Sequence, residues 1–162
     1  MNIHEFVTLI NQMKQGPVPR RLIFLWSGSE AALVEILDGI EIHRCELVSV
    51  RPSSSSTNED PKKLLEAYIN HQFQDYEEQR NEPSALIIGD AILLGRYGCN
   101  MSTFFRYGIS PRSAVILVFP PESHRRFPVK TDGWVKRNTR TVIESVSKQL
   151  GEPNCIIEAS GG

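Results

Sequence analysis

Apolar positions along the chain follow two patterns, one typical of amphipathic helices and one typical of buried strands. Near the start, apolar residues recur every three or four positions from Ile3 to Met13, and Gly16-Pro17 ends this predicted helix. Further helices are predicted over residues 30–37, 60–79, around 101–105, and over 142–150. Continuous apolar runs bounded by turn residues predict strands at residues 22–26, 45–50, 84–88, 113–119 and 155–157.

The alternation of these elements predicts an α/β fold. Strands that are apolar on both faces, separated by amphipathic helices, require a mostly parallel sheet with helices on both sides. We therefore expect a five-stranded sheet in a three-layer sandwich resembling that of P-loop ATPases. No linker divides the chain, so residues 1–158 are predicted to form one domain, followed by a flexible tail at 159–162.

Composition narrows the class of protein. The 162 residues are 40% hydrophobic and 23% charged, which is ordinary for a folded domain. A net charge of −1 provides no global attraction to nucleic acid or to an anionic membrane, so such binding requires a local patch. Three widely spaced cysteines, and no signal-like N-terminus or membrane-spanning run, indicate a cytoplasmic protein in a reducing compartment that does not bind membranes.

Ser27-Gly28-Ser29 occupies the place of a phosphate loop, between the first central strand and a helix. Free N–H groups at a helix start bind anions. A Walker A loop also needs several glycines and a Lys-Ser/Thr pair, and this turn has one glycine and no lysine. A plain strand-to-helix turn with a serine cap is therefore favoured over a nucleotide site, and intact P-loop chemistry is excluded.

Asp90 follows the predicted third strand, where a Walker B aspartate would hold magnesium through water. A single carboxylate at a strand end is equally compatible with the N-cap of a helix beginning at Ala91, and the N-cap is favoured. Asp90 is nevertheless the best-placed acidic residue for a vestigial nucleotide site.

A basic segment follows the fourth strand. Six cations lie between Arg125 and Arg140 against Asp132 alone, with Phe127 and Trp134 interleaved. Such a segment can neutralise phosphates and stack on bases, it can bind an acidic protein, or it can be a solvated surface without a binding role. The candidate nucleic-acid or partner-binding residues are Arg106, Arg112, His124, Arg125, Arg126, Lys130, Lys136, Arg137 and Arg140.

Other chemistry is not indicated by the sequence. The four histidines stand alone and no cysteine pair has zinc spacing, so no metal and no cofactor is predicted. Ser27-Gly28-Ser29 is not a Gly-x-Ser-x-Gly nucleophile elbow. No residue set proposes a reaction, and no catalytic residue is predicted.

In the order of these predicted segments, the chain resembles a degenerate additional-strand P-loop ATPase. Within that group it is similar to the small P-loop component of BREX phage-exclusion operons. The similarity is carried by residues 105–112, FRYGISPR, and residues 120–128, PPESHRRFP. Because the loop glycines and lysine are missing, the resemblance implies a scaffold or adaptor in a DNA-directed defence complex, without ATP-dependent activity.

The sequence thus favours a non-catalytic accessory subunit that binds other protein subunits and, through the basic segment, DNA. One alternative is a small nucleotide-binding domain or enzyme that uses the strand ends near Ser27, Asp90 and Glu122. Another is an interaction module with no role in nucleic-acid binding.

Overall fold

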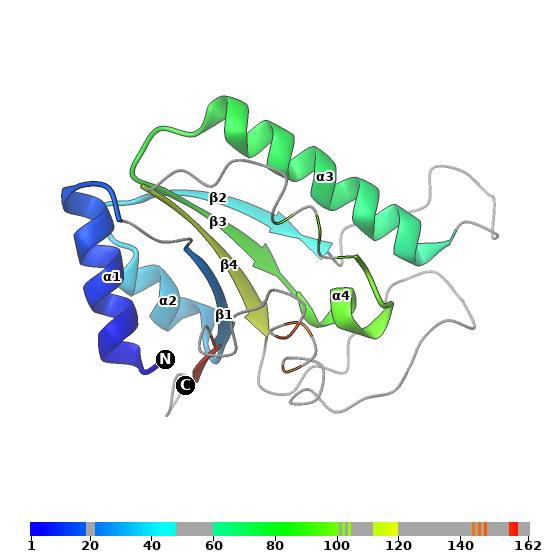
Figure 1. The fold of residues 1–162 in the computed structure, drawn as a ribbon, viewed down its shortest axis with the longest axis horizontal. Coiled ribbons are helices and arrows are strands. Elements are labelled where there is room, and N and C mark those ends of the chain that lie inside the picture. Colours follow the sequence, from blue (N-terminus) through cyan, green and yellow to red (C-terminus); the bar gives the residue numbers. More distant parts are fainter. Residues whose placement is uncertain are drawn as a thin grey trace.

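The described strands of the computed structural model form one parallel five-stranded sheet (Figure 1). The structure describes residues 1–18, 22–47, 60–100, 102, 104, 112–119, 144, 146, 148 and 156–158. The strands are β1 (Ile23–Ser27), β2 (Glu41–Glu46), β3 (Ser84–Gly89), β4 (Ser113–Phe119) and β5 (Ile156–Glu158). Their order across the sheet is β2-β3-β4-β1-β5, so β2 and β5 are the edges.

Helices cover both faces of this sheet, which confirms the predicted α/β fold (Figure 1). One face packs against α1 (Ile3–Gln15) and α2 (Glu30–Ile36), and the other against α3 (Pro61–Gln79) and α4 (Ile92–Arg96). Side chains alternate between the faces along each strand, so the sheet separates two apolar cores. In β4, for example, Ile116 belongs to the α1/α2 core and Leu117 to the α3/α4 core.

Polar contacts fix both ends of α1. At its start, the Glu5 amide donates to the Asn2 side chain at 2.9 Å, and the Asn2 amide donates to the Glu5 carboxylate at 3.0 Å, forming a capping box. At its end, Arg112 donates to the carbonyls of Met13 and Lys14 at 3.2 and 2.7 Å. Arg112 therefore links the last turn of α1 to the start of β4.

The prediction for the second strand was wrong in position. The strand was expected at residues 45–50, whereas β2 spans Glu41–Glu46. Because β2 is an edge strand, it carries charged and partly exposed residues and has no continuous apolar run. The apolar pattern that located β3 and β4 is therefore missing from it.

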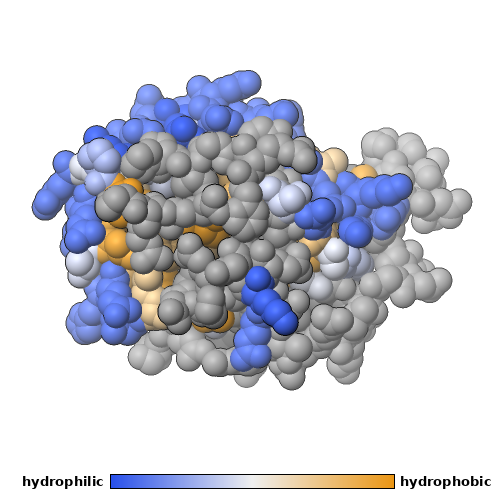
Figure 2. All heavy atoms as spheres, viewed as in Figure 1, coloured by the Kyte–Doolittle hydropathy of each residue, from blue (hydrophilic) through white to orange (hydrophobic). Residues whose placement is uncertain are grey.

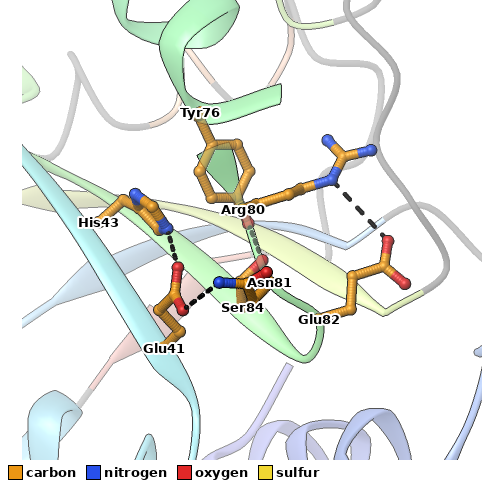
Figure 3. Close-up of polar contacts among 7 residues, drawn as sticks. All are labelled: Glu41, His43, Tyr76, Arg80, Asn81, Glu82 and Ser84. Atoms are coloured by element: carbon orange, nitrogen blue, oxygen red, sulfur yellow. Dashed lines mark hydrogen bonds and ion pairs between the residues drawn. The ribbon is translucent and has the colours of Figure 1, made fainter. Parts of the chain in front are cut away.

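The long helix α3 begins and ends on polar contacts. Asp60 accepts a hydrogen bond from the Lys62 amide at 3.0 Å, as the Asp-Pro start predicts. At the other end, the Tyr76 hydroxyl lies 2.8 Å from the hydroxyl of fully buried Ser84 (Figure 3). It also hydrogen-bonds the Ser113 side chain. Ser84 and Ser113 are cross-strand partners in β3 and β4. These hydroxyls join α3 to the two central strands.

We expect Tyr76→Phe to lower the free energy of unfolding by about 1–2 kcal/mol, because it leaves buried serine hydroxyls without a partner. Urea denaturation followed by circular dichroism measures the change. Adding Ser84→Ala should recover part of the loss, since both partners are then apolar. An unchanged unfolding midpoint in Tyr76→Phe would contradict this role.

Candidate functional site at the carboxyl edge of the sheet

The carboxyl edge of the sheet is where ligands bind in open α/β folds. Both predicted elements of the vestigial nucleotide site lie there, because Ser27 is the last residue of β1 and Asp90 directly follows β3. They are not on neighbouring strands: β4 lies between β1 and β3. The sheet therefore brings the two elements to one edge and places a strand between them.

The Ser27-Gly28-Ser29 turn is held by the indole of the preceding residue. Trp26 is fully buried, and its Nε1 donates to the Ser29 carbonyl at 2.9 Å. Gly28 adopts φ 148°, a conformation that favours glycine. Ser29 is the N-cap residue of α2, but its side chain makes no capping hydrogen bond. The turn is thus a strand-to-helix connection, and the predicted serine cap is correct in position only.

An ion pair lies beside this turn. Glu30, the first residue of α2, pairs with Arg44 of β2 through Oε1 and Nη2 at 3.2 Å. Both side chains are partly exposed, so the pair adds little to stability. Its carboxylate nevertheless places a negative charge at the helix N-terminus, where an anionic ligand would otherwise be attracted.

A second carboxylate lies over the end of β3. Glu46 and Gly89 are register partners at the ends of β2 and β3. A Cβ atom added to Gly89 would lie 2.6 Å from Cδ of Glu46 and 2.7 Å from its Oε1. The glycine therefore provides the space in which the Glu46 carboxyl group lies.

Asp90 follows in a left-handed conformation, with φ 54°, and only 6% of its surface is exposed. Aspartate tolerates this conformation better than most residues. The interpretation of Asp90 as a helix N-cap is wrong, because α4 begins at Ile92 and its N-cap is Ala91. The Asp90 backbone still contributes, since its carbonyl accepts from the Leu93 amide at 3.1 Å.

Carboxylates of Glu30, Glu46 and Asp90 all lie at or next to this edge, and Glu46 and Asp90 interact with other parts of the chain. A carboxylate at a helix start or a strand end disfavours a polyphosphate at that position by like-charge repulsion. The described residues contain no cluster of three or more acidic, histidine or cysteine side chains suited to hold a metal ion.

Sequence reasoning missed Glu30, Arg44 and Glu46. Placing the second strand at residues 45–50 put Glu46 near its start, although it is the last residue of β2. A strand read from residue 41 would have placed Glu46 at the edge beside Gly89. The ion pair between α2 and β2 has no signal in the sequence, because it depends on how the helix crosses the sheet.

Most of the predicted basic surface lies outside the described residues. This holds for Arg106, His124, Arg125, Arg126, Lys130, Lys136, Arg137 and Arg140. Arg112 is described, and its guanidinium binds the end of α1. Its part in a binding surface stays a prediction. Of the helices that the structure describes, none has the length and apolar character to cross a membrane.

A further polar cluster lies at the opposite, amino edge of the sheet (Figure 3). Glu41 contacts Nε2 of His43 at 2.5 Å and accepts from the Asn81 amide group at 3.3 Å. The hydrogen bond with His43 lowers the pKa of the Glu41 carboxyl group. These contacts therefore weaken as the pH falls through that lowered pKa. The cluster fastens the start of β2 to the loop after α3.

The reactivity of the Cys45 thiol provides a test of how the chain packs beside Glu46. Burial, and then the charge of Glu46, raise the pKa of the Cys45 thiol to about 12, and burial likewise raises that of Cys99 to about 12. At pH 8 only about one molecule in ten thousand then carries either thiolate. In a Cys155→Ser background, we expect iodoacetamide to modify neither thiol in native buffer and both in urea. A thiol that reacts natively at the rate of free cysteine would show that this packing is wrong.

Models of known protein families give no match to this chain. A search of curated proteins likewise finds no matching sequence. The geometry of the carboxyl edge and the residue pattern therefore carry the functional argument.

Proposed function

We propose that this chain is a non-catalytic accessory subunit, an adaptor built on a P-loop-like scaffold. The proposal rests on which residues are present and which are missing at the carboxyl edge of the sheet. The Ser27-Gly28-Ser29 turn lacks the lysine and extra glycines of a phosphate loop. Carboxylates of Glu30 and Glu46 occupy the helix start and the end of β3. An edge of this kind is suited to hold the fold together, and poorly suited to bind a nucleoside triphosphate.

The strand arrangement supports the scaffold part of the proposal. In the resemblance to the additional-strand ATPases, the strand at residues 113–119 takes the place of the sensor strand. Here β4 lies between β1, which precedes Ser27, and β3, which precedes Asp90. Other parallel α/β folds can have the same strand order, so the order alone does not identify a family. The role in a BREX-like phage-defence complex is therefore part of the proposal.

The basic segment between Arg125 and Arg140 supplies the binding part of the proposal. Its cations and interleaved aromatic residues suit a DNA backbone or an acidic protein subunit.

One observation favours the competing function of a nucleotide-binding domain. The Asp90 side chain is buried at the end of a central strand, in a backbone conformation uncommon for residues other than glycine. Residues other than glycine in this conformation are found more often at functional sites than elsewhere. A ligand-binding experiment separates this function from the adaptor.

We expect ATP with magnesium to leave the melting temperature unchanged in a thermal-shift assay. A ligand at 100 times its dissociation constant stabilises the folded state by about 2.7 kcal/mol, which corresponds to several degrees in a domain of this size. A rise of several degrees that is abolished by Asp90→Asn would overturn the adaptor and establish the nucleotide site.

We expect a short DNA duplex to bind the full chain at low salt and to dissociate as salt rises, because phosphate contacts release counterions. Replacing Arg125 and Arg126 with alanine should weaken binding and reduce the slope of log affinity against log salt by about two. Replacing Lys14 and Lys148, which removes the same charge elsewhere, should change neither. Fluorescence anisotropy measures both quantities. Phosphate contacts are stronger at about 50 mM salt than at higher salt. If the chain does not bind the duplex there, DNA is not its partner.

A further inference from the structure

Four charged side chains near the ends of α3 have the signs that the helix dipole disfavours. Lys62 and Lys63 lie in the first turn and Glu77 and Glu78 in the last, and all four residues are exposed. A helix carries partial positive charge at its N-terminus and partial negative charge at its C-terminus, so this placement is unfavourable at both ends. No ion pair with another described residue engages any of the four side chains. The cap residues Asp60 and Arg80 carry charges of the favourable sign and offset part of this cost, but they do not pair with the four side chains.

The exposed face of α3 is polar along most of its length. Its inner face packs into the core through residues 65, 69, 73 and 76. Opposite them, Lys63, Ala67, Asn70, Gln74 and Glu77 are exposed or partly exposed. They follow one another at intervals of four, three, four and three residues, so they lie along one face of the helix. Hydrophilic residues line the upper rim of the molecule in Figure 2, along which α3 runs in Figure 1.

This face is complementary to itself when a second copy is turned around. Asn70 lies midway between Lys63 and Glu77, which are about 21 Å apart along the helix axis. In an antiparallel pair centred on Asn70, Lys63 of each copy faces Glu77 of the other, as two-fold symmetry requires. Ala67 is small enough for the helices to approach closely. The two helix dipoles then also point in opposite directions, which is favourable.

We propose that two copies of this chain associate through antiparallel packing of their α3 helices, with the lysine end of each helix against the glutamate end of the other. The partner is a second copy because one helix supplies both halves of the charge pattern. The association is weak and depends on salt, because exposed ion pairs are screened. Raising NaCl from about 50 mM to about 500 mM should weaken it about tenfold. The proposal does not depend on the adaptor function or on DNA binding.

Sedimentation of the full chain over a concentration series tests this proposal with charge-reversed variants. We expect dimers for the wild type at low salt, and monomers for both Lys62→Glu/Lys63→Glu and Glu77→Lys/Glu78→Lys. Mixing these two variants should restore association, since each end then meets opposite charge. The variant with all four substitutions should dimerise like the wild type. Reversing Glu35 and Asp38, which are exposed near the end of α2, is the matched control and should not change association.

Three results would overturn the proposal. The first is a wild type that stays monomeric at every concentration in low salt. The second is a dimer that survives both charge-reversed variants. The third is a mixture of the two variants, each shown to be folded by circular dichroism, that does not associate. Rescue by mixing separates a direct contact from damage to the fold.

Discussion

Coverage of the central strands on both faces is the constraint on which the structure depends. β3 and β4 are buried along their whole described lengths, so neither face can be left to water. Helices α1 and α2 cover one face and α3 and α4 the other, and two separate apolar cores result. In this arrangement, polar side chains are confined to the two ends of the strands, the edge strand β2 and the outer faces of the helices.

The two ends of the sheet use their polar groups differently. At the amino edge, buried hydroxyls of Tyr76 and Ser84 hold α3 against the central strands. At the carboxyl edge, Glu46 lies over Gly89 and Glu30 pairs with Arg44. Groups that could otherwise have met a ligand are therefore placed close to other parts of the chain. This is the physical basis of the proposed scaffolding role.

Helix α3 has one face in the apolar core and the opposite face exposed to solvent. Its inner face supplies much of one core, so the helix is stable despite the unfavourable charges at its ends. Those charges can therefore serve association without loss of the fold. The basic segment between Arg125 and Arg140 is the proposed binding region for DNA or an acidic protein, and the proposed dimer would carry two such segments. Two weak sites on one assembly bind a long partner such as DNA more tightly than one.

The sequence by itself determined the fold class, because continuous apolar runs and amphipathic spacing follow directly from burial. It located β4, α3 with its Asp60 cap, and the ends of β1 and β3 that carry Ser27 and Asp90. It did not locate β2, because an edge strand is not buried enough to require an apolar run. Only the tertiary structure decided that Glu46 lies over Gly89 and that Arg112 binds the end of α1. Those contacts join residues distant in the chain, and strand order and register, which local patterns do not encode, bring them together.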